Sequence, residues 1–140
     1  MNLSSPVLLV EGDKIYQKAT QRAFKTFCKS TPLKIVGTGA AAIDYLNNLY
    51  NPAPCIILLD LNCSEMSGIN FLMTIKKNTV LKRIPVVVLT TSNDEEDIVD
   101  HYDLSVAGYV VKPVDHQEFA DVINIIDLYR SICAVPPSVY

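Results

Sequence analysis

Five short apolar runs divide the chain into regular segments. One of them, Cys55-Ile56-Ile57-Leu58-Leu59, contains no polar residue and ends at Asp60. An uninterrupted apolar run of this length, bounded by Pro54 and by polar residues, is typical of a strand buried on both faces of a parallel sheet. Comparable runs predict strands at 7–10, 33–36, 85–89 and 108–111. The pattern therefore predicts five strands, with Asp60 at the carboxyl end of the third.

The segments between these runs repeat apolar residues at helical spacing. A first helix should begin at Asp13 or Gly12, which would cap it, and end before Thr31-Pro32. Its expected inner face repeats every fourth residue and comprises Ile15, Ala19, Ala23 and Phe27, with Phe24 beside them. Further helices are predicted at 40–50, where Tyr50 is assigned to the inner face, and at 68–78 and 93–104. The last of these begins with acidic residues and has few apolar ones, so we expect it to be partly exposed.

The final helix should begin at Asp115 and carries two apolar rows. The rows are Phe119, Val122, Ile123 and Ile126 in one, and Ile125, Leu128, Tyr129 and Ile132 in the other. One row should cover the sheet and leave part of the other exposed, and an exposed apolar stripe often marks an interface. A homodimer through the fourth helix, fifth strand and fifth helix is one hypothesis. The alternative is that the irregular tail, residues 133–140, covers this row.

Alternating strands and helices predict the fold class. Strands that are each followed by a helix require crossover connections and a parallel sheet with helices on both faces. We therefore expect one doubly wound α/β domain over residues 1–132. No linker, repeat or low-complexity segment interrupts it.

Composition excludes several classes of function. The 140 residues are 49% hydrophobic and 19% charged, with a net charge of −3 and scattered basic residues, so we expect no nucleic-acid binding. No apolar run approaches the roughly 20 residues of a membrane span, and the start of the chain has no signal-peptide pattern. The four cysteines form no C-x-x-C pair. A cytoplasmic protein with reduced thiols is the expectation.

Polar residues follow four of the predicted strands. They are Glu11 and Asp13 after the first, Asp60 and Asn62 after the third, Thr90 after the fourth, and Lys112 after the fifth. Each alone is explained more simply as a cap, a turn residue or a solvated charge. Together they lie at the carboxyl ends of one sheet, where open α/β folds bind ligands. Carboxylates with an ammonium and a hydroxyl suit Mg²⁺ and a phosphoryl group.

These motifs resemble those of a known family. Four blocks carry the resemblance: Leu8-Leu9-Val10-Glu11, Ile57-Leu58-Leu59-Asp60-Leu61-Asn62 followed by Gly68, the block 85–90, and Gly108-Tyr109-Val110-Val111-Lys112-Pro113. In these blocks the chain resembles the receiver domain of bacterial two-component response regulators, the CheY-like domains. The resemblance covers about residues 6–130 and implies the sheet order 2-1-3-4-5. The sequence of residues 81–92 and 105–109 looks most like that of the small regulators that partner bacterial phytochromes.

The resemblance implies a role for each matching residue. Asp60 would accept a phosphoryl group from the phosphohistidine of a sensor histidine kinase, and the kinase would be phytochrome-like. Thr90 and Lys112 would contact that group, and Tyr109 would change rotamer as Thr90 moves. Glu11, Asp13, Asp60 and the backbone carbonyl of Asn62 would hold Mg²⁺. A cis peptide before Pro113 is also implied.

Gly12 breaks the family pattern. The family has two adjacent acidic residues after the first strand, and Gly12 stands where the second, a direct Mg²⁺ ligand, is usual; Ser64 and Ser67 are further departures. Three explanations remain open: Glu11 reaches the metal, Asp13 swings in on the flexible glycine, or the Mg²⁺ site is weak. We predict weakened Mg²⁺ affinity, because Gly12 removes one carboxylate ligand from the site. Phosphoryl transfer relies on the metal to neutralise charge, so a weak site would impair that chemistry.

Four functions fit the sequence to different degrees. We expect a stand-alone, non-enzymatic receiver whose output is a phosphorylation-dependent protein contact. A pseudo-receiver that binds a partner without phosphate is the alternative, favoured by Gly12. A phosphatase using Asp60 as nucleophile would want an acid at Asn62. A flavodoxin-like cofactor binder would want a phosphate loop after the first strand, and none is present.

Overall fold

The computed structural model describes residues 5–60 and 66–134. Within these residues, five strands alternate with five α-helices, and a short 3-10 turn lies between α3 and β4. The bounds are β1 (Val7–Val10), α1 (Lys14–Phe27), β2 (Leu33–Val36), α2 (Gly39–Asn47), β3 (Ile56–Leu59), α3 (Gly68–Lys77), η1 (Leu81–Arg83), β4 (Val86–Thr90), α4 (Glu95–Asp103), β5 (Gly108–Val111) and α5 (His116–Ile132).

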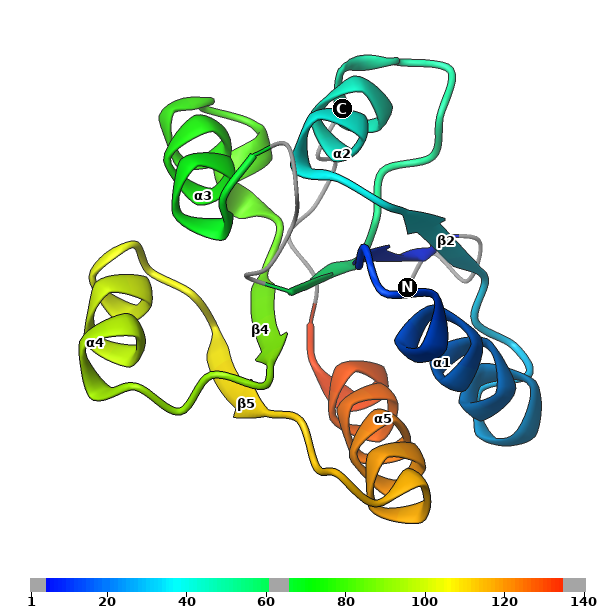
Figure 1. Cartoon of the computed structure of the whole chain (residues 1–140). Coiled ribbons are helices and arrows are strands. Elements are labelled where there is room, and N and C mark those ends of the chain that lie inside the picture. Colours follow the sequence, from blue (N-terminus) through cyan, green and yellow to red (C-terminus); the bar gives the residue numbers. More distant parts are fainter. Residues whose placement is uncertain (1–4, 61–65, 135–140) are drawn as a thin grey trace.

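All five strands are parallel, in the order β2-β1-β3-β4-β5. The predicted fold class and strand order are therefore confirmed. Helices α1 and α5 lie on one face of the sheet and α2 and α3 on the other, while α4 lies beside the β4–β5 end (Figure 1). Because every crossover returns the chain in the same direction, the carboxyl ends of the strands meet at one edge.

The sheet separates two apolar cores. On one face, the side chains of Phe71, Leu72 and Ile75 from α3 pack with those of alternate strand residues such as Leu8 and Ile57. The opposite face holds a second cluster that includes Phe24, Phe119 and Ile123 from α1 and α5. All residues of β1 and β3 are buried, as the uninterrupted apolar runs predict.

The predicted inner face of helix α1 is confirmed at Ala19, Ala23 and Phe24 but is wrong at its two ends. Its buried residues are Thr20, Ala23 and Phe24, whereas Ile15 and Phe27 are exposed. The predicted spacing of four drifts by about 40° at each step around a helix of 3.6 residues per turn, so its ends leave the inner face. The predicted cap is confirmed, because the Asp13 carboxylate accepts a hydrogen bond from the backbone N–H of Ile15 at 2.8 Å.

Two smaller expectations are wrong. Helix α2 ends at Asn47, so Tyr50 lies beyond it and is 99% exposed rather than turned inward. No cis peptide occurs among the residues that the structure describes, so the bond before Pro113 is trans.

The two rows of α5 behave as predicted. Phe119 and Ile123 are buried, while the second row, Ile125, Leu128, Tyr129 and Ile132, is 57–81% exposed. The Asp115 side chain accepts from the Glu118 amide and caps the helix. Residues 135–140 of the expected tail lie outside the described part of the chain, so the division at residue 132 stays a prediction.

The cysteines are unpaired where the structure describes them, and the described helices are not of the membrane-spanning kind. Cys28, Cys55 and Cys133 are free cysteines, and Cys63 lies outside the described residues. Burial raises the pKa of the Cys28 thiol to about 12, which keeps it protonated. Among the described helices, none has the length and apolar character needed to span a bilayer.

Candidate functional site

The sheet brings Glu11, Asp60, Thr90 and Lys112 to its carboxyl edge. Glu11 follows β1, Asp60 follows β3, Thr90 ends β4 and Lys112 follows β5. All four are buried, with exposed fractions between 0 and 6%. Buried charged groups require partners, so these side chains must be considered together.

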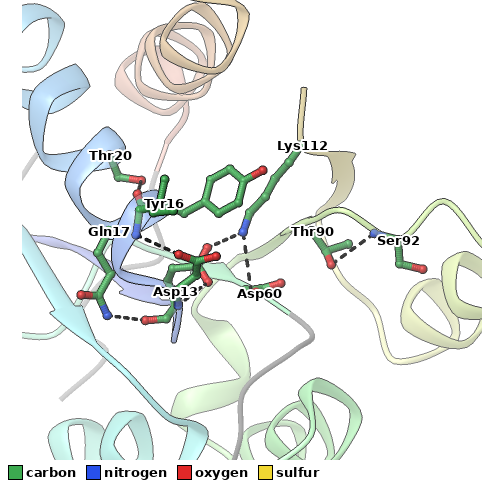
Figure 2. A network of polar contacts seen from close by, with 10 residues as sticks. Asp13, Tyr16, Gln17, Thr20, Asp60, Thr90, Ser92 and Lys112 are labelled. Carbon is green, nitrogen blue, oxygen red and sulfur yellow. Dashed lines mark hydrogen bonds and ion pairs between the residues drawn. The ribbon is translucent and has the colours of Figure 1, made fainter. Parts of the chain in front are cut away.

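The Lys112 ammonium contacts both carboxylates of this group, and its contact with Asp60 can be followed in Figure 2. It forms a buried ion pair and hydrogen bond with Glu11 Oε1, and its Nζ lies 3.7 Å from Asp60 Oδ2. The predicted convergence of these three residues is therefore present. One ammonium facing two carboxylates leaves the group with an excess of negative charge if both carboxylates are ionised.

Protonation of Glu11 relieves part of that excess. Burial, followed by hydrogen bonding to Asp60, raises the pKa of Glu11 from 4.5 to about 7, although Lys112 acts in the opposite direction. Near neutral pH the site therefore exchanges a proton at Glu11. Of the two carboxylates beside Lys112, Asp60 is the one that lines the adjoining cavity.

Tyr16 is a site residue that the sequence analysis missed. The Lys112 Nζ lies 3.8 Å from the centroid of the Tyr16 ring, and that ring packs against Phe119 with centroids 5.4 Å apart. A cation over an aromatic face is stabilised by the ring's negative π cloud. One signal could have indicated it, because Tyr16 begins the stripe of α1 that continues through Thr20, Ala23 and Phe24.

Glu11 and Asp13 have different positions and partners at the end of β1. The backbone N–H of Asp13 donates to Glu11 Oε2 at 3.2 Å, and the Glu11 carbonyl oxygen accepts from the Gln17 side chain at 2.6 Å. Glu11 is thereby held inward, against Lys112. The Asp13 carboxylate is exposed and caps α1, so it stands at the rim of the site.

An open cavity of about 370 Å³ adjoins these groups. Its lining residues are Gly12, Asp13, Tyr16, Asp60, Thr91 and Lys112. Two carboxylates therefore face one cavity, with Gly12 between them and contributing no side chain. No group of three His, Cys, Asp or Glu residues placed to hold a metal occurs among the residues described. Asn62 and Ser64 lie outside those residues.

This donor set fits a loosely held Mg²⁺ ion. Magnesium is commonly bound through one or two carboxylates while it keeps several waters, and phosphate oxygens complete its shell. Asp13 and Asp60 satisfy that minimum. Glu11 fits less well as a direct ligand, because its carboxylate is already paired with Lys112.

The predicted switch residues lie side by side with this group. The Thr90 side chain is fully buried, and its Oγ1 accepts a long hydrogen bond of 3.5 Å from the Ser92 amide. The Tyr109 hydroxyl donates to the Ser92 carbonyl oxygen at 2.9 Å, and its ring packs against the core. Ser67, the departure before Gly68, caps α3 by accepting from the Asn70 amide.

Comparison with known proteins identifies the family. The model of the response regulator receiver domain matches residues 7–124. The chain therefore belongs to the response regulator receiver domain family of two-component signalling.

Its similar relatives include regulators associated with phytochromes. The chain is 37% identical over 127 residues to the response regulator Rcp1 of Synechocystis sp., covering 88% of this chain and 86% of Rcp1. The Mn²⁺-bound structure of Rcp1 has a TM-score of 0.86 at 35% identity, covering 94% of this chain and 99% of that one. The phosphorylated cyanobacterial phytochrome response regulator RcpA has a TM-score of 0.88 at 33% identity, covering 96% and 99%. The resemblance to phytochrome-associated regulators is confirmed.

Proposed function

We propose that the chain is a signalling switch that accepts a phosphoryl group on Asp60 from the phosphohistidine of a sensor histidine kinase. The observation that carries this proposal is the position of Asp60, which lines an open cavity at the sheet edge with Lys112 Nζ 3.7 Å from its carboxylate. Its output would be a phosphorylation-dependent contact with another protein, and we place it among switches rather than enzymes.

The chemistry follows from the charges at this edge. An Asp60 oxygen forms a bond to phosphorus while the bond from phosphorus to the donor's imidazole nitrogen breaks, and the nitrogen keeps the electron pair. Lys112 offsets the negative charge of the incoming phosphoryl oxygens. The Thr90 hydroxyl, at the end of the neighbouring strand, is the donor for one of those oxygens.

Magnesium would be held by Asp13 and Asp60, together with the backbone carbonyl of Asn62 that the family resemblance implies. When bound, the ion neutralises charge on the transferring phosphoryl group. Two carboxylates without a third support a weak site, as Gly12 predicts. Asp13 can hold the ion while it caps α1, because the cap uses only its Oδ1.

A pseudo-receiver is the second candidate, and one observation favours it. Lys112 is already paired with the buried Glu11, so the ammonium has a partner before any phosphate arrives. A chain that signals through this closed arrangement would bind a partner without phosphorylation. Retention of Asp60, Thr90 and Lys112 in one group supports the phosphoacceptor instead.

Two partners are proposed, one from the comparisons and one from exposed apolar residues. Similarity to Rcp1 and to the phytochrome regulator RcpA supports a phytochrome-like histidine kinase as donor. The exposed row of α5 and the 42% exposed Val111 of β5 support a homodimer through α4, β5 and α5.

Acetyl phosphate labelling tests the proposal. With Mg²⁺, intact mass should show one added phosphoryl group on the wild type and none on Asp60→Asn. Asp13→Asn should slow labelling if Asp13 holds the ion, whereas Asp44→Asn, a change outside the site, should not. Absence of label from acetyl phosphate and from phosphoramidate, at any Mg²⁺ concentration, would favour the pseudo-receiver.

A further inference from the structure

Helix α4 is attached to the domain through a polar residue. Within α4, which is described throughout, His101 is the one buried residue and is 2% exposed. The apolar residues Val99 and Tyr102 are 56% and 50% exposed. Helices normally dock through an apolar stripe, so a buried histidine in that place requires an explanation.

This histidine and three neighbouring residues form a closed ring of contacts. His101 Nδ1 lies 2.5 Å from the Asp97 carbonyl oxygen, and the Asp97 carboxylate accepts from the Ser92 hydroxyl at 2.8 Å. The Tyr109 hydroxyl donates to the Ser92 carbonyl oxygen at 2.9 Å. The Tyr109 ring meets the His101 ring edge-on, with centroids 5.8 Å apart and planes at 68°. We call Ser92, Asp97, His101 and Tyr109 the α4 latch.

We propose that His101 is the positioning residue of this latch: it fixes α4 and Tyr109 as one unit and leaves that unit easy to open. The contacts explain why α4 and Tyr109 are held as one unit. Tyr109 cannot leave its packed position without losing the Ser92 hydrogen bond and the His101 ring contact. Helix α4 likewise cannot move away without separating those two rings.

The second imidazole nitrogen of His101, Nε2, explains why this unit opens easily. A carbonyl oxygen only accepts hydrogen bonds, so Nδ1 carries the proton toward Asp97, and Nε2 of the neutral ring presents a lone pair. Among the described residues, Nε2 is the one buried side-chain nitrogen or oxygen without a hydrogen-bond partner. A buried acceptor without a donor destabilises the closed state, and opening α4 lets water reach it.

The latch is connected to the phosphoacceptor edge through Ser92. The Ser92 amide donates to Thr90 Oγ1 at 3.5 Å, while its hydroxyl and carbonyl oxygen hold Asp97 and Tyr109. Movement of Thr90 toward a phosphoryl group on Asp60 would therefore act on α4 directly. This step rests on the proposed function, but the latch itself does not.

Two substitutions separate the contributions of His101. His101→Asn retains a side-chain amide that can donate to the Asp97 carbonyl but removes the ring beside Tyr109. His101→Phe retains a ring beside Tyr109 but removes both ring nitrogens, the unpaired Nε2 and the Nδ1 that contacts the Asp97 carbonyl oxygen, which the backbone of α4 already pairs. Asp100→Asn is the matched control, because it places asparagine at the neighbouring exposed position of the same helix.

Hydrogen exchange of the unphosphorylated full chain, followed by mass spectrometry, measures the opening of α4. We expect exchange of α4 amides about fivefold faster in His101→Asn and about fivefold slower in His101→Phe, with Asp100→Asn within twofold of wild type. Ser92→Ala should also accelerate it. Unchanged exchange in α3 shows that each variant is folded.

Three results would overturn the proposal. They are exchange within twofold of wild type in both His101 variants, acceleration by His101→Phe with α3 unchanged, and equal acceleration by Asp100→Asn and His101→Asn. Beryllofluoride with Mg²⁺ then tests the proposed function separately. No response of the wild type to this phosphoryl analogue counts against phosphorylation and leaves the latch result standing, since that result is obtained without phosphate.

Discussion

The buried Glu11 carboxyl should make the protein less stable as the pH rises toward neutrality. Its pKa is raised from 4.5 to about 7, first by burial and then by hydrogen bonding to Asp60. Between these two pH values the native state holds a proton that the unfolded chain has lost. Because the native state binds more protons there, the free energy of unfolding decreases with increasing pH.

The size of this effect follows from the pKa change. A carboxyl group displaced from 4.5 to about 7 removes about 3 kcal/mol from the free energy of unfolding, all of it by the time the pH exceeds 7. This is a large fraction of the stability of a single domain. This pH dependence of the free energy of unfolding is opposite in sign to that of an ordinary carboxylate in a surface ion pair, whose contribution to stability grows as the pH rises.

Urea unfolding from pH 4 to pH 8 in EDTA measures it. Glu11→Gln retains the shape and the neutral form of the side chain at every pH, so its stability should exceed that of the wild type increasingly as the pH rises. Glu118→Gln, an exposed change on α5, should follow the wild type. Parallel profiles for wild type and Glu11→Gln would refute the reasoning, because Glu11 would then titrate alike in the native and unfolded states.

Three further changes test neighbouring features. Gly12→Asp should tighten Mg²⁺ binding about tenfold by calorimetry; its Cβ would lie 3.2 Å from the Gly37 carbonyl oxygen, so Gly12→Ala isolates the steric cost. Unchanged affinity in Gly12→Asp would show that two carboxylates suffice. Tyr16→Leu should lower the free energy of unfolding by about 1 kcal/mol through loss of the Lys112 contact, and Tyr16→Phe should not; equal losses would exclude that contact. Leu128→Glu should give a monomer by light scattering without loss of stability, and a monomeric wild type would remove the dimer hypothesis.

The strands and the convergent edge could be predicted from the sequence because burial on both faces leaves an unmistakable pattern. A wholly apolar run such as 55–59 does not fit a segment at the surface, so it predicts a buried strand. The polar residues that follow the runs must then meet at one edge, because the strands are parallel. Asp60 and Lys112 therefore lie together as predicted. The pairing of Lys112 with Glu11 does not follow from the order of elements, since it depends on side-chain rotamers.

Helix faces were predicted less well, for identifiable reasons. In α1, apolar residues at a spacing of four predict an inner face, but a helix of 3.6 residues per turn moves the ends of such a row off the core. Tyr16 was missed because an aromatic residue at helical spacing is usually core rather than a partner for a buried ammonium. His101 was missed because hydropathy assigns a histidine among acids to the surface. Its burial depends on the Tyr109 ring of the neighbouring strand.

Location of the phosphoryl group tests the central claim most directly. After treatment with acetyl phosphate and Mg²⁺, borohydride converts an aspartyl phosphate to homoserine, which peptide mapping can place. The account predicts homoserine at position 60 alone, and none in Asp60→Asn. Homoserine at another aspartate, or an unmodified Asp60 peptide in protein that carries a phosphoryl group, would contradict it.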